Sequence, residues 1–122
     1  MKSYTDIEQS KKLAEILQLE SADMFYCYCM DIKTKECNYD ETPTIEDKLY
    51  KRDIGDIPCW SLAALLDVLP EGIIENWYIP NLQKENSKYS IAYGDDELLY
   101  ISDNPVDACY ELILKLHELK ML

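Results

Sequence analysis

The sequence SDNPVDACYELILKLHELKML, residues 102–122, decides the C-terminal part of the fold. Asn104 is a preferred helix N-cap, and Pro105 suits the first helical position, where its missing N–H costs no hydrogen bond. Asp107 complements the positive end of the helix dipole. We therefore predict a helix from residue 105 to about residue 121. At about 100° per residue, its core face consists of Cys109, Leu112, Ile113, Leu116 and Leu119.

A second stripe runs along the same predicted helix, at spacings of four, three and four residues: Tyr110, Leu114, His117 and Met121. Either the N-terminal helix covers this stripe, or it is an exposed apolar patch that pairs with a second copy or another protein. We interpret His117, the only histidine, as a packing residue. A nucleophilic pair with Cys109 is excluded because the two side chains lie about 12 Å apart along the helix axis.

Upstream of this helix, the pattern predicts an antiparallel meander with strands around residues 74–78, 88–93 and 97–102. Asn86-Ser87 and residues 94–96 have the composition of turns, and Pro80 limits pairing after the first strand. Strand alternation places several large side chains on one face, and these tyrosines either line an open protein-binding face or pack under the C-terminal helix. The tyrosines concerned are Tyr78, Tyr89, Tyr93 and Tyr100.

Still further upstream, CWSLAALLDVLP (residues 59–70) predicts a compact helix with Ser61 as its N-cap. Its leucine-rich surface predicts that this helix is the most buried of the protein. We interpret Trp60 and Trp77 as core anchors.

The N-terminal half has weaker signals. Thr5-Asp6-Ile7-Glu8 has the form of a capping box, which predicts a helix over about residues 6–19. MFYCYCMDI, residues 24–32, predicts a strand. The charge-rich residues 33–58 predict a long surface connection with at most one helical turn, a type of segment that is often functional.

Five cysteines occur in the chain, and Cys27 and Cys29 share one face of the predicted strand. A zinc site would need Cys37 and either Cys59 or His117 in addition, and the chain lacks a second pair at the usual zinc-knuckle spacing. We therefore interpret the cysteines as reduced, buried side chains. We expect no metal, no cofactor, no small-molecule ligand and no catalytic residue.

The chain has 122 residues, 48% of them hydrophobic, and 24 acidic against 12 basic side chains give a net charge of −12. These values predict one globular domain, with a helix, strand and loop region over residues 1–57 and a helix–meander–helix core over residues 58–122. The expected class is α+β, with a small antiparallel sheet of three or four strands, helices packed on one face, and the C-terminal helix last.

The same values bear on partners and location. The acidity disfavours nucleic acids and anionic membranes as direct ligands, since both favour a basic surface. The N-terminus has no apolar signal-peptide core, and no apolar run approaches the roughly 20 residues of a membrane span. We therefore expect a cytoplasmic protein.

Two segments, PCWSLAALLDVLP (residues 58–70) and SDNPVDACYELILKLHELKML, resemble the central and C-terminal signatures of a family of small uncharacterised proteins of gut Bacteroidales and their phages and mobile elements. The resemblance covers about the last 65 residues of this chain. It implies a cytoplasmic, mobile-element setting and contributes no catalytic residues.

The leading functional hypothesis is an accessory protein-interaction domain without catalytic activity, which binds a protein partner or forms a homodimer. One alternative is an acidic DNA mimic that inhibits a nucleic-acid-binding protein. The acidic residues are spread almost evenly over the two halves of the chain, which disfavours a concentrated mimic strip. A second alternative is a zinc- or thiol-dependent activity.

Overall fold

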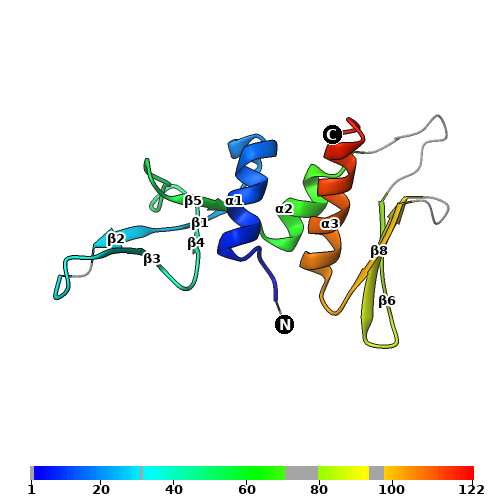
Figure 1. The fold of residues 1–122 in the computed structure, drawn as a ribbon, viewed down its shortest axis with the longest axis horizontal. Coiled ribbons are helices and arrows are strands. Elements are labelled where there is room, and N and C mark those ends of the chain that lie inside the picture. The colour runs from blue at the N-terminus through cyan, green and yellow to red at the C-terminus, as the bar shows by residue number, and fades with distance from the viewer. Residues whose placement is uncertain (1, 31, 71–79, 94–97) are drawn as a thin grey trace.

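Figure 1 shows the computed structural model, which describes residues 2–30, 32–70, 80–93 and 98–122. The fold is α+β, as predicted, and its helices lie between two groups of strands. The helices are α1 (Ile7–Ile16), a 3-10 helix η1 (Leu19–Ser21), α2 (Leu62–Val68) and α3 (Pro105–Glu118). The strands are β1 (Met24–Tyr26), β2 (Tyr28–Met30), β3 (Cys37–Tyr39), β4 (Thr44–Ile45), β5 (Ile57–Cys59), β6 (Pro80–Glu85), β7 (Lys88–Tyr93) and β8 (Leu98–Ser102). Among these residues, no helix has both the length and the apolar content to span a bilayer.

Helix α3 forms the centre of the main hydrophobic core. The Asn104 side chain accepts a hydrogen bond from the Asp107 N–H at 2.8 Å, and Pro105 occupies the first turn, so the predicted start is confirmed. One side of α3 packs on β7 and β8, and α2 packs against it as well. Four of the five predicted core residues are fully buried, namely Cys109, Leu112, Ile113 and Leu116. Leu119 is 45% exposed because the helix ends at Glu118 rather than near residue 121.

The C-terminal sheet is an antiparallel meander in the order β6-β7-β8. Asn86 and Ser87 form the two-residue turn of its first hairpin, and both have a positive φ, as a type I′ turn requires. Strands β7 and β8 lie where the sequence predicts them. The third strand is β6, which begins at Pro80 on the edge of the sheet; the predicted strand over residues 74–78 lies outside the described residues.

A second, separate sheet has the order β4-β1-β5, and β2 and β3 form a hairpin of their own. The predicted single strand over residues 24–32 is therefore wrong: it is two short strands, and neither joins the meander. Residues 33–58 contain three short strands in place of a helical turn. Strands of two or three residues are too short to show a hydrophobic period, and their long-range partners determine them.

Helix α1 begins one residue later than the predicted capping box. Asp6 is the N-cap: its side chain accepts from the Gln9 N–H at 2.7 Å, while the Gln9 side chain accepts from the Asp6 N–H at 3.1 Å. Thr5, the predicted cap, is instead fully buried. Both residue types can cap a helix, so tertiary contacts of Thr5 decide between them.

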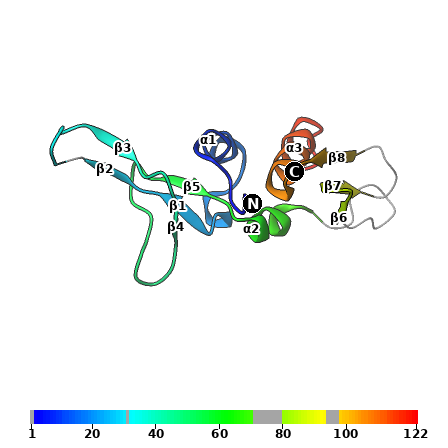
Figure 2. The ribbon, with the colours of Figure 1, turned by 90° about the horizontal axis from the view of Figure 1, so that it is seen from below.

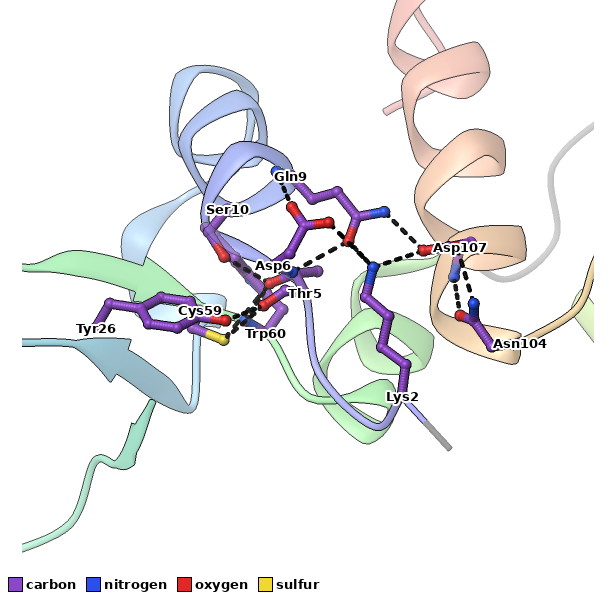
Figure 3. A network of polar contacts seen from close by, with 10 residues as sticks. All are labelled: Lys2, Thr5, Asp6, Gln9, Ser10, Tyr26, Cys59, Trp60, Asn104 and Asp107. Atoms are coloured by element: carbon purple, nitrogen blue, oxygen red, sulfur yellow. Dashed lines mark hydrogen bonds and ion pairs between the residues drawn. The ribbon is translucent and has the colours of Figure 1, made fainter. Parts of the chain in front are cut away.

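Thr5 is the centre of a buried hydrogen-bond network (Figure 3). Its N–H donates to the Trp60 carbonyl at 2.9 Å, and the Trp60 N–H donates to its hydroxyl oxygen at 3.1 Å. The hydroxyl also shares a hydrogen bond of 2.7 Å with the Ser10 hydroxyl. The Tyr26 hydroxyl donates to the Thr5 carbonyl at 2.7 Å. One residue thereby joins α1, β1 and the segment that leads from β5 into α2.

A second contact ties the N-terminal segment to α3 (Figure 3). The Lys2 ammonium lies 2.8 Å from the Asp107 carboxylate and 3.2 Å from that of Asp6. Partial burial alone would raise the pKa of Asp107, but hydrogen bonds from Lys2, Gln9 and Asn104 outweigh it and hold this pKa below its ordinary value. Asp107 therefore remains ionised in the folded protein, where it also complements the helix dipole.

Helix α2 has the predicted N-cap, since the Ser61 side chain accepts from the Ala64 N–H at 3.2 Å. Only Ala64 and Leu65 of this helix are buried, whereas α3 buries seven residues, so the expectation that α2 is the most buried helix is wrong. The Trp60 side chain is fully buried, which confirms it as a core anchor, and its indole N–H donates to Ser21 at 2.9 Å. Trp77 lies outside the described residues.

Replacing Thr5 tests the network. T5V keeps the side-chain shape and removes the hydroxyl, which leaves the buried N–H of Trp60 without its acceptor. We expect the free energy of unfolding to fall by about 1–3 kcal/mol, measured by urea denaturation. T42V is the matched control at an exposed threonine and should change stability by less than about 0.5 kcal/mol. Equal stabilities of T5V and T42V would contradict this role of Thr5.

Candidate functional site

Exposed apolar side chains gather in one region, residues 27–30 and 32–56, which we call the arm. Of the twelve large hydrophobic side chains that are exposed in the described residues, seven belong to the arm. Figures 1 and 2 show that the β2–β3 hairpin extends away from the helices and that the loop between β4 and β5 projects from the body. The seven side chains are Tyr28, Met30, Ile32, Ile45, Leu49, Tyr50 and Ile54.

The loop between β4 and β5 is held by its own polar groups. The Asp47 side chain accepts hydrogen bonds from the N–H groups of Leu49 and Tyr50, at 2.8 and 2.9 Å. At the base of the loop, Arg52 forms an ion pair of 3.1 Å with Glu46, and both side chains are largely buried. These bonds order the backbone of the turn. Leu49 is nevertheless 85% exposed, so this side chain is presented to solvent by a hydrogen-bonded turn.

The β2–β3 hairpin is fixed to this loop by Asp56. One carboxylate oxygen of Asp56 accepts from the Tyr28 N–H at 2.9 Å, and the other accepts from the Asp53 N–H at 2.8 Å. Gly55 has φ +99°, a backbone angle that glycine adopts without strain, and it lies beside the Tyr28 ring. The rings of Tyr28 and Tyr39 are 4.9 Å apart across the two strands. Asp56 therefore links the hairpin to the end of the loop between β4 and β5.

One face of the hairpin carries two thiols. The sulfur atoms of Cys27 and Cys29 are 2.9 Å apart, which confirms that these residues share a face. The hydrogen bond to Cys29, followed by partial burial, raises the pKa of Cys27 to about 11. This thiol is therefore protonated near neutral pH, the opposite of what a cysteine nucleophile requires.

The other cysteines do not join this pair. Cys37 is exposed and pairs with Met30, which places it on the opposite face of the hairpin. Cys59 and Cys109 are fully buried, and burial raises the pKa of Cys109 to about 12. The interpretation of the cysteines as buried therefore holds for Cys59 and Cys109 and is wrong for Cys29 and Cys37.

The second stripe of α3 is only partly accessible. Tyr110, Leu114 and Met121 are half-buried, and His117 is exposed. Tyr110 and Met121 pack against the main core cluster, as do Ala14, Ile16 and Leu17 near the end of α1. The stripe therefore has less exposed apolar surface than the arm.

The tyrosines of the meander lie on the sheet face that carries the core. Tyr93 is 2% exposed, its hydroxyl donates to the Pro70 carbonyl at 2.7 Å, and its neighbour Ile91 is fully buried. Tyr100 packs against the core cluster, and Tyr89 is half-buried beneath the Lys84 ammonium. This face of the sheet packs against α3, so these tyrosines lie under the C-terminal helix rather than lining an open protein-binding face. Tyr78 lies outside the described residues.

The sequence interpretation missed the arm. Residues 33–56 show no period of two or of 3.6, so they predict only a long surface connection, whereas Tyr28, Met30 and Ile32 belong to the predicted strand, whose exposure the sequence does not indicate. The available signal is the residue type: Ile45, Leu49 and Ile54 are large aliphatic side chains inside a polar, proline-containing stretch. Such residues in a long loop indicate either a local core or an exposed contact surface.

Thiol accessibility provides a direct test of this arrangement. With a soluble maleimide in native buffer, Cys37 and Cys29 should be modified rapidly, because both are exposed. Cys59 and Cys109 should be modified only as fast as the molecule unfolds, because both are fully buried. Peptide mass spectrometry measures each rate, and labelling in urea is the control in which all five thiols react. Modification of Cys109 as fast as Cys37 would contradict the structure.

The comparison with known proteins adds no relative. No family model, curated protein or solved structure matches this chain.

Proposed function

We propose that the protein is a cytoplasmic, non-catalytic interaction module that binds another protein through the arm. The observation that carries this proposal is the concentration of seven exposed apolar side chains on the arm. An isolated exposed side chain is ordinary on a protein surface, whereas several of them on two linked projections, the β2–β3 hairpin and the β4–β5 loop, are typical of a binding site. Leu49, Tyr50 and Ile54 are the side chains expected to enter the partner's surface.

The construction of the arm supports this role. Its loop is ordered by the side chains of Asp47, Glu46 and Arg52, so little backbone entropy remains to be lost on binding. The β2–β3 hairpin is a two-stranded sheet, and such a pair is marginal in water until it packs against something else. A partner that covers the hairpin would supply that missing contact.

The net charge of the chain supports a particular kind of partner. The chain carries a net charge of −12, so two copies repel each other at long range, and a protein with basic groups around an apolar patch is attracted. We therefore favour a basic protein partner over a homodimer. The acidity also supports the exclusion of nucleic acids as direct ligands.

Two observations on the cysteines support a cytoplasmic location and a role without thiol chemistry. All five cysteines are described, and all five are free thiols, which suits a reducing compartment such as the cytoplasm. The raised pKa values of Cys27 and Cys109 disfavour these two thiols as nucleophiles.

Capture of partners by two matched variants tests the proposal. The arm variant combines L49S, Y50S and I54S. The control combines L99S and I101S, which replace exposed apolar side chains of β8, a strand outside the arm. We expect quantitative mass spectrometry to find the same protein on immobilised wild type and control, and to find it lost from the arm variant. Its binding should weaken as salt rises. A protein retained equally by the arm variant, or no specific protein on the wild type, would contradict the proposal.

A further inference from the structure

The face of the hairpin that carries the two thiols has a third group beside them. The sulfur atoms of Cys27 and Cys29 and a carboxylate oxygen of Asp40 all lie within 4.8 Å of one another. Among the described residues, this is the one group of three or more cysteine, histidine and acidic side chains close enough to share an ion. We infer that Cys27, Cys29 and Asp40 form a binding site for Zn²⁺.

Strand pairing creates this juxtaposition. Cys27 and Cys29 are two residues apart, so they point to the same side of an extended chain. The Asp40 N–H donates to the Cys27 carbonyl at 3.0 Å, and Cys29 pairs with Asn38, so residue 40 stands directly across from residue 27. The ligand atoms are therefore brought together by backbone hydrogen bonds. Binding requires small rotations of the side chains and the loss of the two thiol protons, which Zn²⁺ displaces into the buffer.

The distances suit the ion. Zn²⁺ binds sulfur at about 2.3 Å, so two sulfur atoms in a tetrahedral set lie about 3.8 Å apart. The two thiols are 2.9 Å apart and have to separate by roughly 1 Å, which a change of the side-chain torsions provides.

The chemistry of the donors also suits Zn²⁺. Two soft sulfur ligands and one carboxylate favour Zn²⁺ over Mg²⁺ or Ca²⁺, which prefer sets of oxygen ligands. Asp56, whose carboxylate anchors the hairpin, adds negative potential nearby, which attracts a cation. Three protein ligands leave one coordination position open to water, and because Cys29 and Asp40 are exposed, this position faces solvent.

The site lies on the arm, but its test uses the purified chain without a partner, so the zinc site and the proposed protein interaction can fail separately. The hairpin itself offers matched controls. Cys37 is an exposed thiol on the opposite face of the same two strands, and Glu41 is an exposed carboxylate next to Asp40.

Titration of the reduced 122-residue chain with Co²⁺, a coloured substitute for Zn²⁺, tests the site in the presence of a phosphine reductant that keeps the thiols free. We expect one equivalent to produce the thiolate-to-cobalt absorption band, and one equivalent of Zn²⁺ to remove it. C27S and C29S should lose the band, whereas C37S should keep it. D40N should bind Co²⁺ at least about ten-fold more weakly, whereas E41Q should bind it like the wild type.

Three results would overturn the inference: no thiolate–cobalt band at equimolar Co²⁺, loss of the band in C37S as complete as in C29S, or unchanged affinity of D40N. Circular dichroism of each variant confirms that the fold is retained. Because the substituted residues are exposed or half-buried, the variants should fold like the wild type.

Discussion

The buried hydrogen bonds of Thr5 are the constraint on which the arrangement of the N-terminal half depends. Its backbone and hydroxyl together contact Ser10 in α1, Tyr26 in β1 and Trp60 at the entry to α2. A polar group with several buried partners is costly to lose, because each partner is left without water and without a bond. The contact of Lys2 with Asp107 extends the same N-terminal segment to α3, so residues from both ends of the chain meet there.

This arrangement explains why the arm can expose apolar surface without endangering the fold. The main core consists of α3, α2, the inner face of the meander and the end of α1, and none of the arm's seven exposed side chains belongs to it. Most of the hydrophobic stabilisation therefore comes from side chains outside the arm. The arm is ordered instead by local polar bonds around Asp47 and Asp56, which leave its apolar side chains free to contact another molecule.

The sequence predicts those elements whose signals are local. Asn104 with Pro105, Ser61 and the Asn86-Ser87 turn all act on their own neighbours, and the structure confirms each of them. Strands β4 and β5 escape prediction because they are two and three residues long and are defined by pairing with distant β1. Alternation shows which tyrosines share a face of the meander, but only tertiary packing decides that α3 covers that face. The close approach of Asp40 to Cys27 likewise depends on the β2–β3 hairpin, which the sequence pattern does not predict.

Hydrogen exchange of the wild-type chain, followed by NMR, tests most directly whether the fold is complete without the arm's apolar side chains. Amides of Leu112 and Leu116 in α3 should exchange only through global unfolding, because they lie in the main core. Amides of Leu49 and Tyr50, which are bonded only to the exposed Asp47 carboxylate, should exchange much faster through local opening. Exchange of the arm amides as slow as that of α3 would mean that the arm is part of the cooperative core, and would contradict its assignment as a surface kept free for a partner.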